Sequence, residues 1–229
     1  MKTGTSGFIY KNWVGCFYPP DLPKSKYLEY YASKFDTLEL NSTFYKIPKE
    51  STFKAWKYKL KKLNLSLSIK ANRAITHTHR LKNPEIANDF IKKALLVENL
   101  DTILFQLPPS LKYDGPLLEN FINGLIDARY AIEFRNKSWY NDKTYEILKS
   151  RNISLVWHDF NQEFITEKTA DFVYIRFHGY TGKYKGSYPD EILKKFAGYE
   201  NGFAYFNNTD DCSAPFDALR FKKIIEEKK

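Results

Sequence analysis

Residues 130–139 alternate between apolar and polar side chains in the way expected of a β-strand with one face in a core. Tyr130, Ile132 and Phe134 fall on one side of such a strand, and Glu133 and Arg135 fall on the other. Charged side chains are tolerated in a buried strand only when they are paired or used for binding. We therefore expect this strand to form one edge of a functional site.

The same pattern recurs along the chain, and segments with helical periodicity separate most of its occurrences. The predicted strands cover residues 1–6, 37–41, 65–71, 101–107, 130–139, 153–159, 171–178 and 202–208. The predicted helices cover residues 25–35, 51–63, 83–99, 115–127, 138–151, 189–199 and 214–228. Asn83 and Pro84 suit the N-cap and first position of the third helix. Only about ten residues separate strands six and seven, so we expect a short or irregular connection there.

Polar side chains lie at or beside the carboxyl end of every predicted strand, which favours a closed barrel over an open sheet. An open sheet binds its ligand at one switch point, whereas a barrel builds its site from many strand ends. By strand parity, the inward side chains are Glu39, Asn41, Lys70, Gln106, Glu133, Arg135, His158, Arg176, His178 and Asn207. Asp159 has the opposite parity and is expected in the loop or on the rim. The pattern predicts an α/β fold consisting of a single (β/α)8 TIM barrel over residues 1–229.

Composition and charge narrow the class of partner. The net charge is +9 at neutral pH, which favours an anionic small molecule or nucleic acid. The amino-terminal residues lack the apolar run of a signal peptide, and no segment is apolar enough to cross a bilayer, so we expect a cytoplasmic protein without a membrane partner. Cys16 and Cys212 show no metal or redox spacing and are expected to be free thiols. The sequence does not specify an oligomeric state.

The inward cluster contains the side chains that an anion-binding site requires. Arg135 and Arg176 offer planar forks that suit phosphate or carboxylate oxygens, and Lys70 adds a point charge. The glycine-rich residues 179–188 follow strand seven, where many barrels bind phosphate through backbone N–H groups. The other ligand-binding candidates are Asn41, Gln106, Asp159 and Asn207. Without a ligand, the same acids and cations would simply form a lattice of salt bridges.

Hydrolysis of a phosphoester or nucleic acid is the favoured reaction if the protein is an enzyme. Glu39 or Glu133 would act as the general base, and His158 or His178 would act as the acid. The expected rim residues are Trp13, Tyr45, His77 and Trp139. The candidates for stacking on bases are Trp13, Phe44, Tyr45, Trp139 and Tyr184.

Three other interpretations remain open. Glu39 and Glu133 could be the paired carboxylates of a carbohydrate-active enzyme, or the mouth could bind an anion or nucleic acid without catalysis. A Schiff base on Lys70 is less favoured, because we expect neighbouring carboxylates to keep its amine protonated. We predict no cofactor, and a divalent metal is less favoured than none because the Arg and Lys charges oppose a cation.

Sequence blocks along almost the whole chain resemble one known family. GTSGF, FYPPDLP, LELNSTFY, IKANRAITH, LFQLPPS, EFRNKSW and YFNN are similar to the domain-of-unknown-function 72 family, also called YecE-like. The resemblance implies a TIM barrel, in agreement with the strand count. Suggestions of nucleic-acid or phosphoester chemistry for that family rest partly on a likeness to barrel endonucleases.

Overall fold

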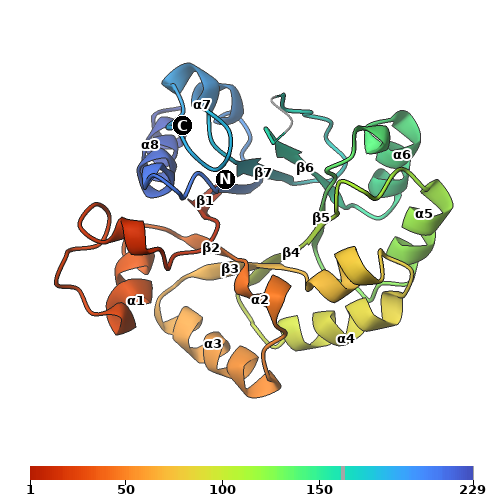
Figure 1. The fold of residues 1–229 in the computed structure, drawn as a ribbon, viewed down its shortest axis with the longest axis horizontal. Coiled ribbons are helices and arrows are strands. Elements are labelled where there is room, and N and C mark those ends of the chain that lie inside the picture. The colour runs from red at the N-terminus through yellow and green to blue at the C-terminus, as the bar shows by residue number, and fades with distance from the viewer. Residues whose placement is uncertain (161–162, 229) are drawn as a thin grey trace.

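The computed structural model describes residues 1–160 and 163–228, in which eight parallel strands form a nearly closed barrel (Figure 1). The strands are β1 Lys2–Thr5, β2 Thr37–Leu40, β3 Ser66–Lys70, β4 Leu100–Gln106, β5 Tyr130–Glu133, β6 Ser154–His158, β7 Val173–Phe177 and β8 Gly202–Phe206. Their spatial order follows the chain, and β1 pairs with β8. The predicted TIM barrel is therefore confirmed.

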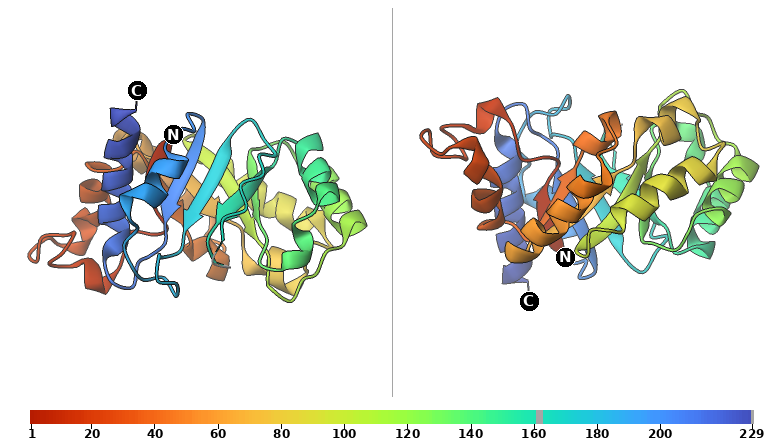
Figure 2. Two further views of the ribbon diagram at one scale, coloured as in Figure 1. Left: turned by 90° about the horizontal axis from the view of Figure 1, so that it is seen from above. Right: turned by 90° about the horizontal axis from the view of Figure 1, so that it is seen from below.

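Helices cover most of the outer surface of the sheet (Figures 1 and 2), whereas the short helix that follows β2 lies at the carboxyl ends of the strands. They are α1 Tyr27–Ala32, α2 Ser42–Tyr45, α3 Glu50–Lys62, α4 Pro84–Ala94, α5 Gly115–Asn123, α6 Asp142–Ser150, α7 Asp190–Phe196 and α8 Ser213–Glu227. The Asn83 side chain accepts hydrogen bonds from Glu85 N and Ile86 N, which confirms the predicted start of α4. No helix of the described residues is long and apolar enough to span a membrane.

The segments that follow β5 and β6 depart from the regular alternation of strand and helix. The stretch 130–139 is a strand only as far as Glu133, and Lys137–Trp139 forms a 3-10 turn whose start is capped by the Asn136 side chain. Between β6 and β7 the described residues contain no helix, as predicted. There the Thr169 hydroxyl accepts from Leu155 N at 2.7 Å and donates to Ile153 O at 2.6 Å, so side-chain bonds hold the connection against β6.

The barrel closes between β1 and β2 through a seam that a tyrosine completes. Near the carboxyl ends, Gly7 N donates to Glu39 O at 2.7 Å. Further down, the Tyr31 hydroxyl accepts from Thr5 N at 2.8 Å and donates to Thr37 O at 3.1 Å, replacing a direct bond between the strands. Gly4 leaves room for this hydroxyl, because a Cβ there would lie 2.9 Å from it and would overlap the Thr37 carbonyl oxygen.

The barrel interior is apolar in its middle and polar toward the carboxyl ends of the strands. The inner apolar cluster consists of Leu104, Ala131, Val156, Phe172, Tyr174, Phe203 and Tyr205. The Tyr205 hydroxyl lies within hydrogen-bond distance of Ser68 Oγ (2.8 Å) and Thr37 Oγ1 (2.7 Å), so its polar tip is satisfied. The charged side chains of the candidate site lie beyond this cluster, toward the carboxyl ends of the strands.

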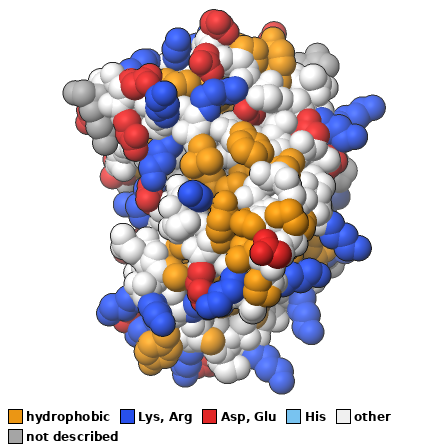
Figure 3. Space-filling model, turned by 90° about the vertical axis from the view of Figure 1, so that its left-hand side faces the viewer, with side chains coloured by type: hydrophobic (Ala, Val, Ile, Leu, Met, Phe, Trp, Pro, Cys, Tyr) orange, Lys and Arg blue, Asp and Glu red, His pale blue; other side chains and the backbone are white. Residues whose placement is uncertain are grey.

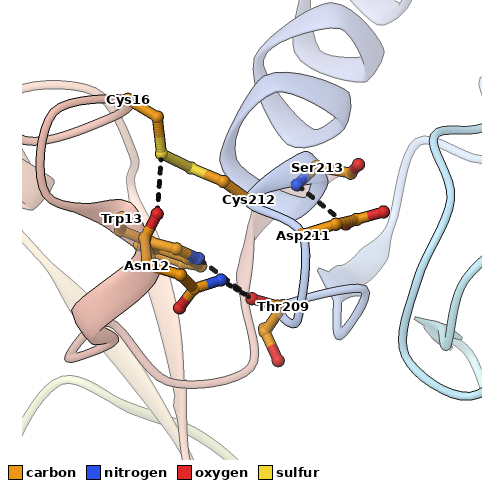
Figure 4. The surroundings of a disulfide bond; sticks show 7 residues. All are labelled: Asn12, Trp13, Cys16, Thr209, Asp211, Cys212 and Ser213. Atoms are coloured by element: carbon orange, nitrogen blue, oxygen red, sulfur yellow. Dashed lines mark hydrogen bonds between the residues drawn. A yellow bond between two sulfur atoms is a disulfide. The ribbon is translucent and has the colours of Figure 1, made fainter.

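The expectation of two free thiols is wrong, because Cys16 and Cys212 form a disulfide (Figure 4). The bond joins the loop before α1 to the residue that precedes α8. Asn12 Nδ2 also donates to Thr209 O, at 2.7 Å. The spacing of 196 residues hid the pair, since contact between these segments depends on the closed barrel. Figure 3 shows apolar side chains gathered across the side that carries this loop and α8.

Candidate functional site

Arg176 is the centre of the charged cluster at the barrel mouth. Its Nη2 lies 2.7 Å from Glu39 Oε1, and its Nη1 lies 2.6 Å from Glu133 Oε2. Tyr174 donates to the other Glu39 oxygen at 2.7 Å, and Ser6 Oγ also donates to Glu39. Neither carboxylate is exposed to solvent. One buried guanidinium therefore joins the acids of β2 and β5.

Mutual electrostatics keep Glu133 and Arg176 ionised in spite of their burial. Burial alone would raise the pKa of Glu133, but Arg135 and Arg176 hold that pKa well below its usual range. Burial would likewise lower the pKa of Arg176. Glu39 and Glu133 outweigh the effect of burial, so the pKa of Arg176 is raised. Glu133 is therefore a charged partner of Arg135 and Arg176, and a carboxylate held in this way is a poor general base.

Arg135 connects this cluster to a histidine. It forms an ion pair with Glu133, and its Nη2 lies 3.0 Å from His178 Nε2. A guanidinium can only donate, so His178 Nε2 accepts and the proton of the neutral ring is on Nδ1, which lies 3.3 Å from Asp159 Oδ1. Burial, reinforced by Arg135, lowers the pKa of His178 well below its usual value. The Phe160 ring covers the Arg135 guanidinium at 3.7 Å.

Lys70 occupies a different electrostatic position from the one expected. Its Nζ donates to Gln106 Oε1 at 2.7 Å and lies 4.3 Å from the centre of the Phe44 ring. Burial and Arg176 lower the pKa of Lys70 to about 8, against the opposing effect of Glu133 and Glu39. Glu133 and Glu39 favour the protonated amine, as expected, but burial and Arg176 outweigh their effect on the pKa.

A pocket of about 400 Å³ opens above the cluster. It is lined by Tyr10, Asn41, Phe44, Tyr45, Lys70, Gln106, Arg135, Arg176, Tyr184, Asn207, Thr209 and Asp210. Thus the structure brings together Asn41, Lys70, Gln106, Arg135, Arg176, Asn207 and Tyr45 of the predicted set. Sequence reasoning missed Tyr10, Thr209 and Asp210, which lie in loops after β1 and β8 and carry no strand parity to mark them.

The expected catalytic residues lie behind the pocket lining. Glu39, Glu133 and His178 are buried beneath the arginines. His158 is buried as well, with Nε2 at 2.9 Å from Phe134 O and Nδ1 accepting from Phe160 N. It therefore holds the backbone of Phe134, next to Arg135, and that of Phe160, whose ring covers Arg135. Asp159 lies in the loop directly after β6, where it accepts hydrogen bonds from His178 N and the Tyr188 hydroxyl.

Two expected rim residues are core residues instead. Trp13 and Trp139 have no exposed surface, so the rim position predicted for them is wrong. Trp139 stacks on Phe134 and donates to Leu111 O at 2.7 Å, which satisfies its polar atom inside the fold. His77 is half-buried and packs edge-on against Phe44, so it supports a pocket wall.

The glycine-rich loop after β7 uses its amides internally. Gly179 N donates to the Tyr188 hydroxyl, Gly182 N donates to Gly179 O, and Gly186 N donates to an Asp211 carboxylate oxygen. The expected backbone cradle for a phosphate is therefore not available in this conformation. Within residues 1–160 and 163–228, no group of three or more His, Cys, Asp or Glu side chains could hold a metal ion.

A barrel of eight parallel strands with a polar pocket at their carboxyl ends defines a TIM-barrel protein. The chain belongs to the family described as "Protein of unknown function DUF72", whose model matches residues 2–229. This confirms the resemblance seen in the sequence blocks.

Known proteins similar to the chain support the same assignment. A DUF72 family protein from Thermotoga maritima MSB8 has 27% sequence identity and a TM-score of 0.82, with 98% of each chain covered. UPF0759 protein YunF of Bacillus subtilis (strain 168) is 29% identical over 140 residues, which are 56% of this chain and 49% of YunF. The match thus spans about half the length of that curated relative.

The fold is also shared with more distant barrels. A structure of D-psicose 3-epimerase in the presence of D-fructose has a TM-score of 0.62 at 12% identity, with 97% of each chain covered. At this identity the likeness shows the fold alone.

Proposed function

We propose that the pocket binds a small hydroxylated compound that carries a phosphate or carboxylate group. The observation that carries this proposal is the arrangement of charge: Lys70, Arg135 and Arg176 line the pocket, while Glu39 and Glu133 lie behind them. An entering anion would meet the donors first. A volume of about 400 Å³ suits a small molecule.

Amide side chains around the cations supply the second part of the recognition. Asn41, Gln106 and Asn207 line the pocket, and Asn41 Oδ1 is buried without a hydrogen-bond partner in the described residues. Such an acceptor suits a ligand hydroxyl, because an unsatisfied buried oxygen is costly.

The same geometry disfavours the two reactions that rely on free carboxylates. Arg176 lies between Glu39 and Glu133 and binds both, so neither is free to activate water or to attack a sugar carbon. We therefore propose binding of an anionic compound without assigning hydrolysis to these acids.

A nucleic-acid strand end is the second candidate ligand. Tyr45 lines the pocket with 74% of its surface exposed, and Tyr184 lines it as well. Exposed rings beside cationic side chains are suited to stacking bases while the phosphate is bound.

Calorimetric titration with glycerol 3-phosphate tests the first candidate, because this probe has a phosphate and hydroxyls but no carbonyl group. We expect binding that glycerol does not show. Binding should weaken at least about tenfold in Arg135→Gln, which loses a charge-assisted contact. Arg129→Gln is the matched control, since Arg129 is exposed and directly precedes β5, at the opposite end of the barrel.

Equal affinity for glycerol and glycerol 3-phosphate, or equal losses in the two variants, would contradict the proposal. Binding of a short single-stranded oligonucleotide that is lost in Arg135→Gln, without binding of glycerol 3-phosphate, would instead favour the nucleic-acid candidate.

A further inference from the structure

Lys70 carries a primary amine that faces the pocket without an acidic partner. Across residues 1–160 and 163–228, no carboxylate lies within ion-pair distance of its Nζ, whose hydrogen bond goes to the neutral Gln106 amide. The two nearest strand acids, Glu39 and Glu133, are bound by Arg176 instead. Lysines on protein surfaces usually remain charged and solvated, so this environment is unusual.

The surroundings of Lys70 increase the fraction of the neutral, nucleophilic form of the amine. Burial withdraws water from the ammonium, and the Arg176 and Arg135 charges repel it. With its pKa near 8, the neutral fraction at pH 7.5 is on the order of a hundred times that of an ordinary lysine. Desolvation and a neighbouring cation are the conditions under which lysine amines attack carbonyl carbons.

We propose that Lys70 forms a covalent imine with the carbonyl carbon of a small aldehyde or ketone sugar whose anionic group is held in the same pocket. This inference rests on the proposed anion-binding function and names the chemistry of its ligand. The pocket holds both required elements, since Lys70 lines it together with the guanidinium of Arg135.

The reaction balances with the groups present and water. The ammonium of Lys70 first releases one proton, and the neutral amine forms a C–N bond while the carbonyl electron pair moves to oxygen. One N–H proton is transferred to that oxygen, giving a carbinolamine. The released proton returns to this hydroxyl, the C–O bond breaks, and water leaves. The product is a protonated imine with the same charge as the starting ammonium. The amide oxygen of Gln106, at 2.7 Å from Nζ, is placed to orient the amine.

Reductive trapping with sodium cyanoborohydride tests the proposal on the full chain. D-Glyceraldehyde 3-phosphate is the probe, and neutral D-glyceraldehyde is its matched control. Peptide mapping should find Lys70 labelled at least about tenfold faster than any other lysine, with an added mass equal to the probe less one oxygen atom. Labelling should rise with pH and level off above about pH 8.5, whereas ordinary lysines continue to gain reactivity.

The Lys70→Arg variant and competition by inorganic phosphate separate the imine proposal from the anion-binding proposal. Lys70→Arg keeps the charge but removes the primary amine, so labelling at this position should disappear. Phosphate binding together with labelling scattered evenly over surface lysines would overturn the imine and leave the anion site in place. Preferential labelling of Lys70 that is equal for both aldehydes and unaffected by inorganic phosphate would support the imine and overturn the anion site.

Discussion

At the scale of single residues, Arg176 determines whether the buried acids are tolerated. Replacing it with Met would leave Glu39 and Glu133 without their shared guanidinium in a site closed to water. Arg176→Met should lower the free energy of unfolding by about 3–5 kcal/mol, the usual cost of removing one partner of a buried ion pair. Urea denaturation at neutral pH measures the loss.

The matched control for Arg176→Met is a lysine in an exposed pair. Lys54 lies 2.6 Å from Glu50 on the surface of α3. Because water screens this pair, Lys54→Met should change the free energy of unfolding by less than about 0.5 kcal/mol. Similar losses in the two variants would contradict the special role of Arg176.

Strand parity predicted which residues point inward, but it could not predict how deep each one lies. Glu39 and Arg176 share the inward side, yet only Arg176 lines the pocket, because it is long enough to reach past the acids. The error for Trp139 has a related cause. An aromatic residue after a strand can cover the mouth or turn into the core, and the Leu111 carbonyl that receives its N–H is remote in sequence.

At the scale of elements, the seam between β1 and β2 leaves no room for a side chain at Gly4. Gly4→Ala would place a methyl group against the Thr37 carbonyl and the Tyr31 hydroxyl, which are already hydrogen-bonded. We expect a loss of about 2 kcal/mol or more in the free energy of unfolding, because the backbone cannot yield without separating the strands. Thermal and urea unfolding would measure it.

Gly198→Ala is the control for this seam, since a Cβ at Gly198 meets no atom within 4 Å. Its unfolding free energy should stay within about 0.5 kcal/mol of the parent protein. An equally mild effect of Gly4→Ala would mean that the seam is looser than these contacts indicate.

The types and order of the elements could be predicted because alternation and helical spacing are local signals. Their ends were less predictable. Residues 134–139 continue an apparent strand in sequence, but the Asn136 side chain accepts from Ser138 N and starts a 3-10 turn instead. The role of Tyr31 was also hidden, since a buried hydroxyl that bridges two strands looks in sequence like any aromatic residue of a helix.

At the scale of the whole molecule, the disulfide joins segments near the two ends of the chain. Cys16 lies in the loop before α1, and Cys212 directly precedes α8. Because the bond closes a loop of 196 residues, it restricts the unfolded chain strongly. The closed barrel is what brings these distant cysteines together, so no local pattern could have predicted the bond.

We therefore expect the Cys16→Ser/Cys212→Ser double variant to lose about 2–4 kcal/mol of unfolding free energy relative to the oxidised protein. Dithiothreitol should lower the stability of the parent protein by a similar amount and leave the double variant unchanged. Thiol titration in denaturant without reductant should find no free thiol in the oxidised protein and one in Cys16→Ser. Two free thiols in protein purified without reductant would contradict the bond and would agree with a cytoplasmic location, where thiols are usually kept reduced.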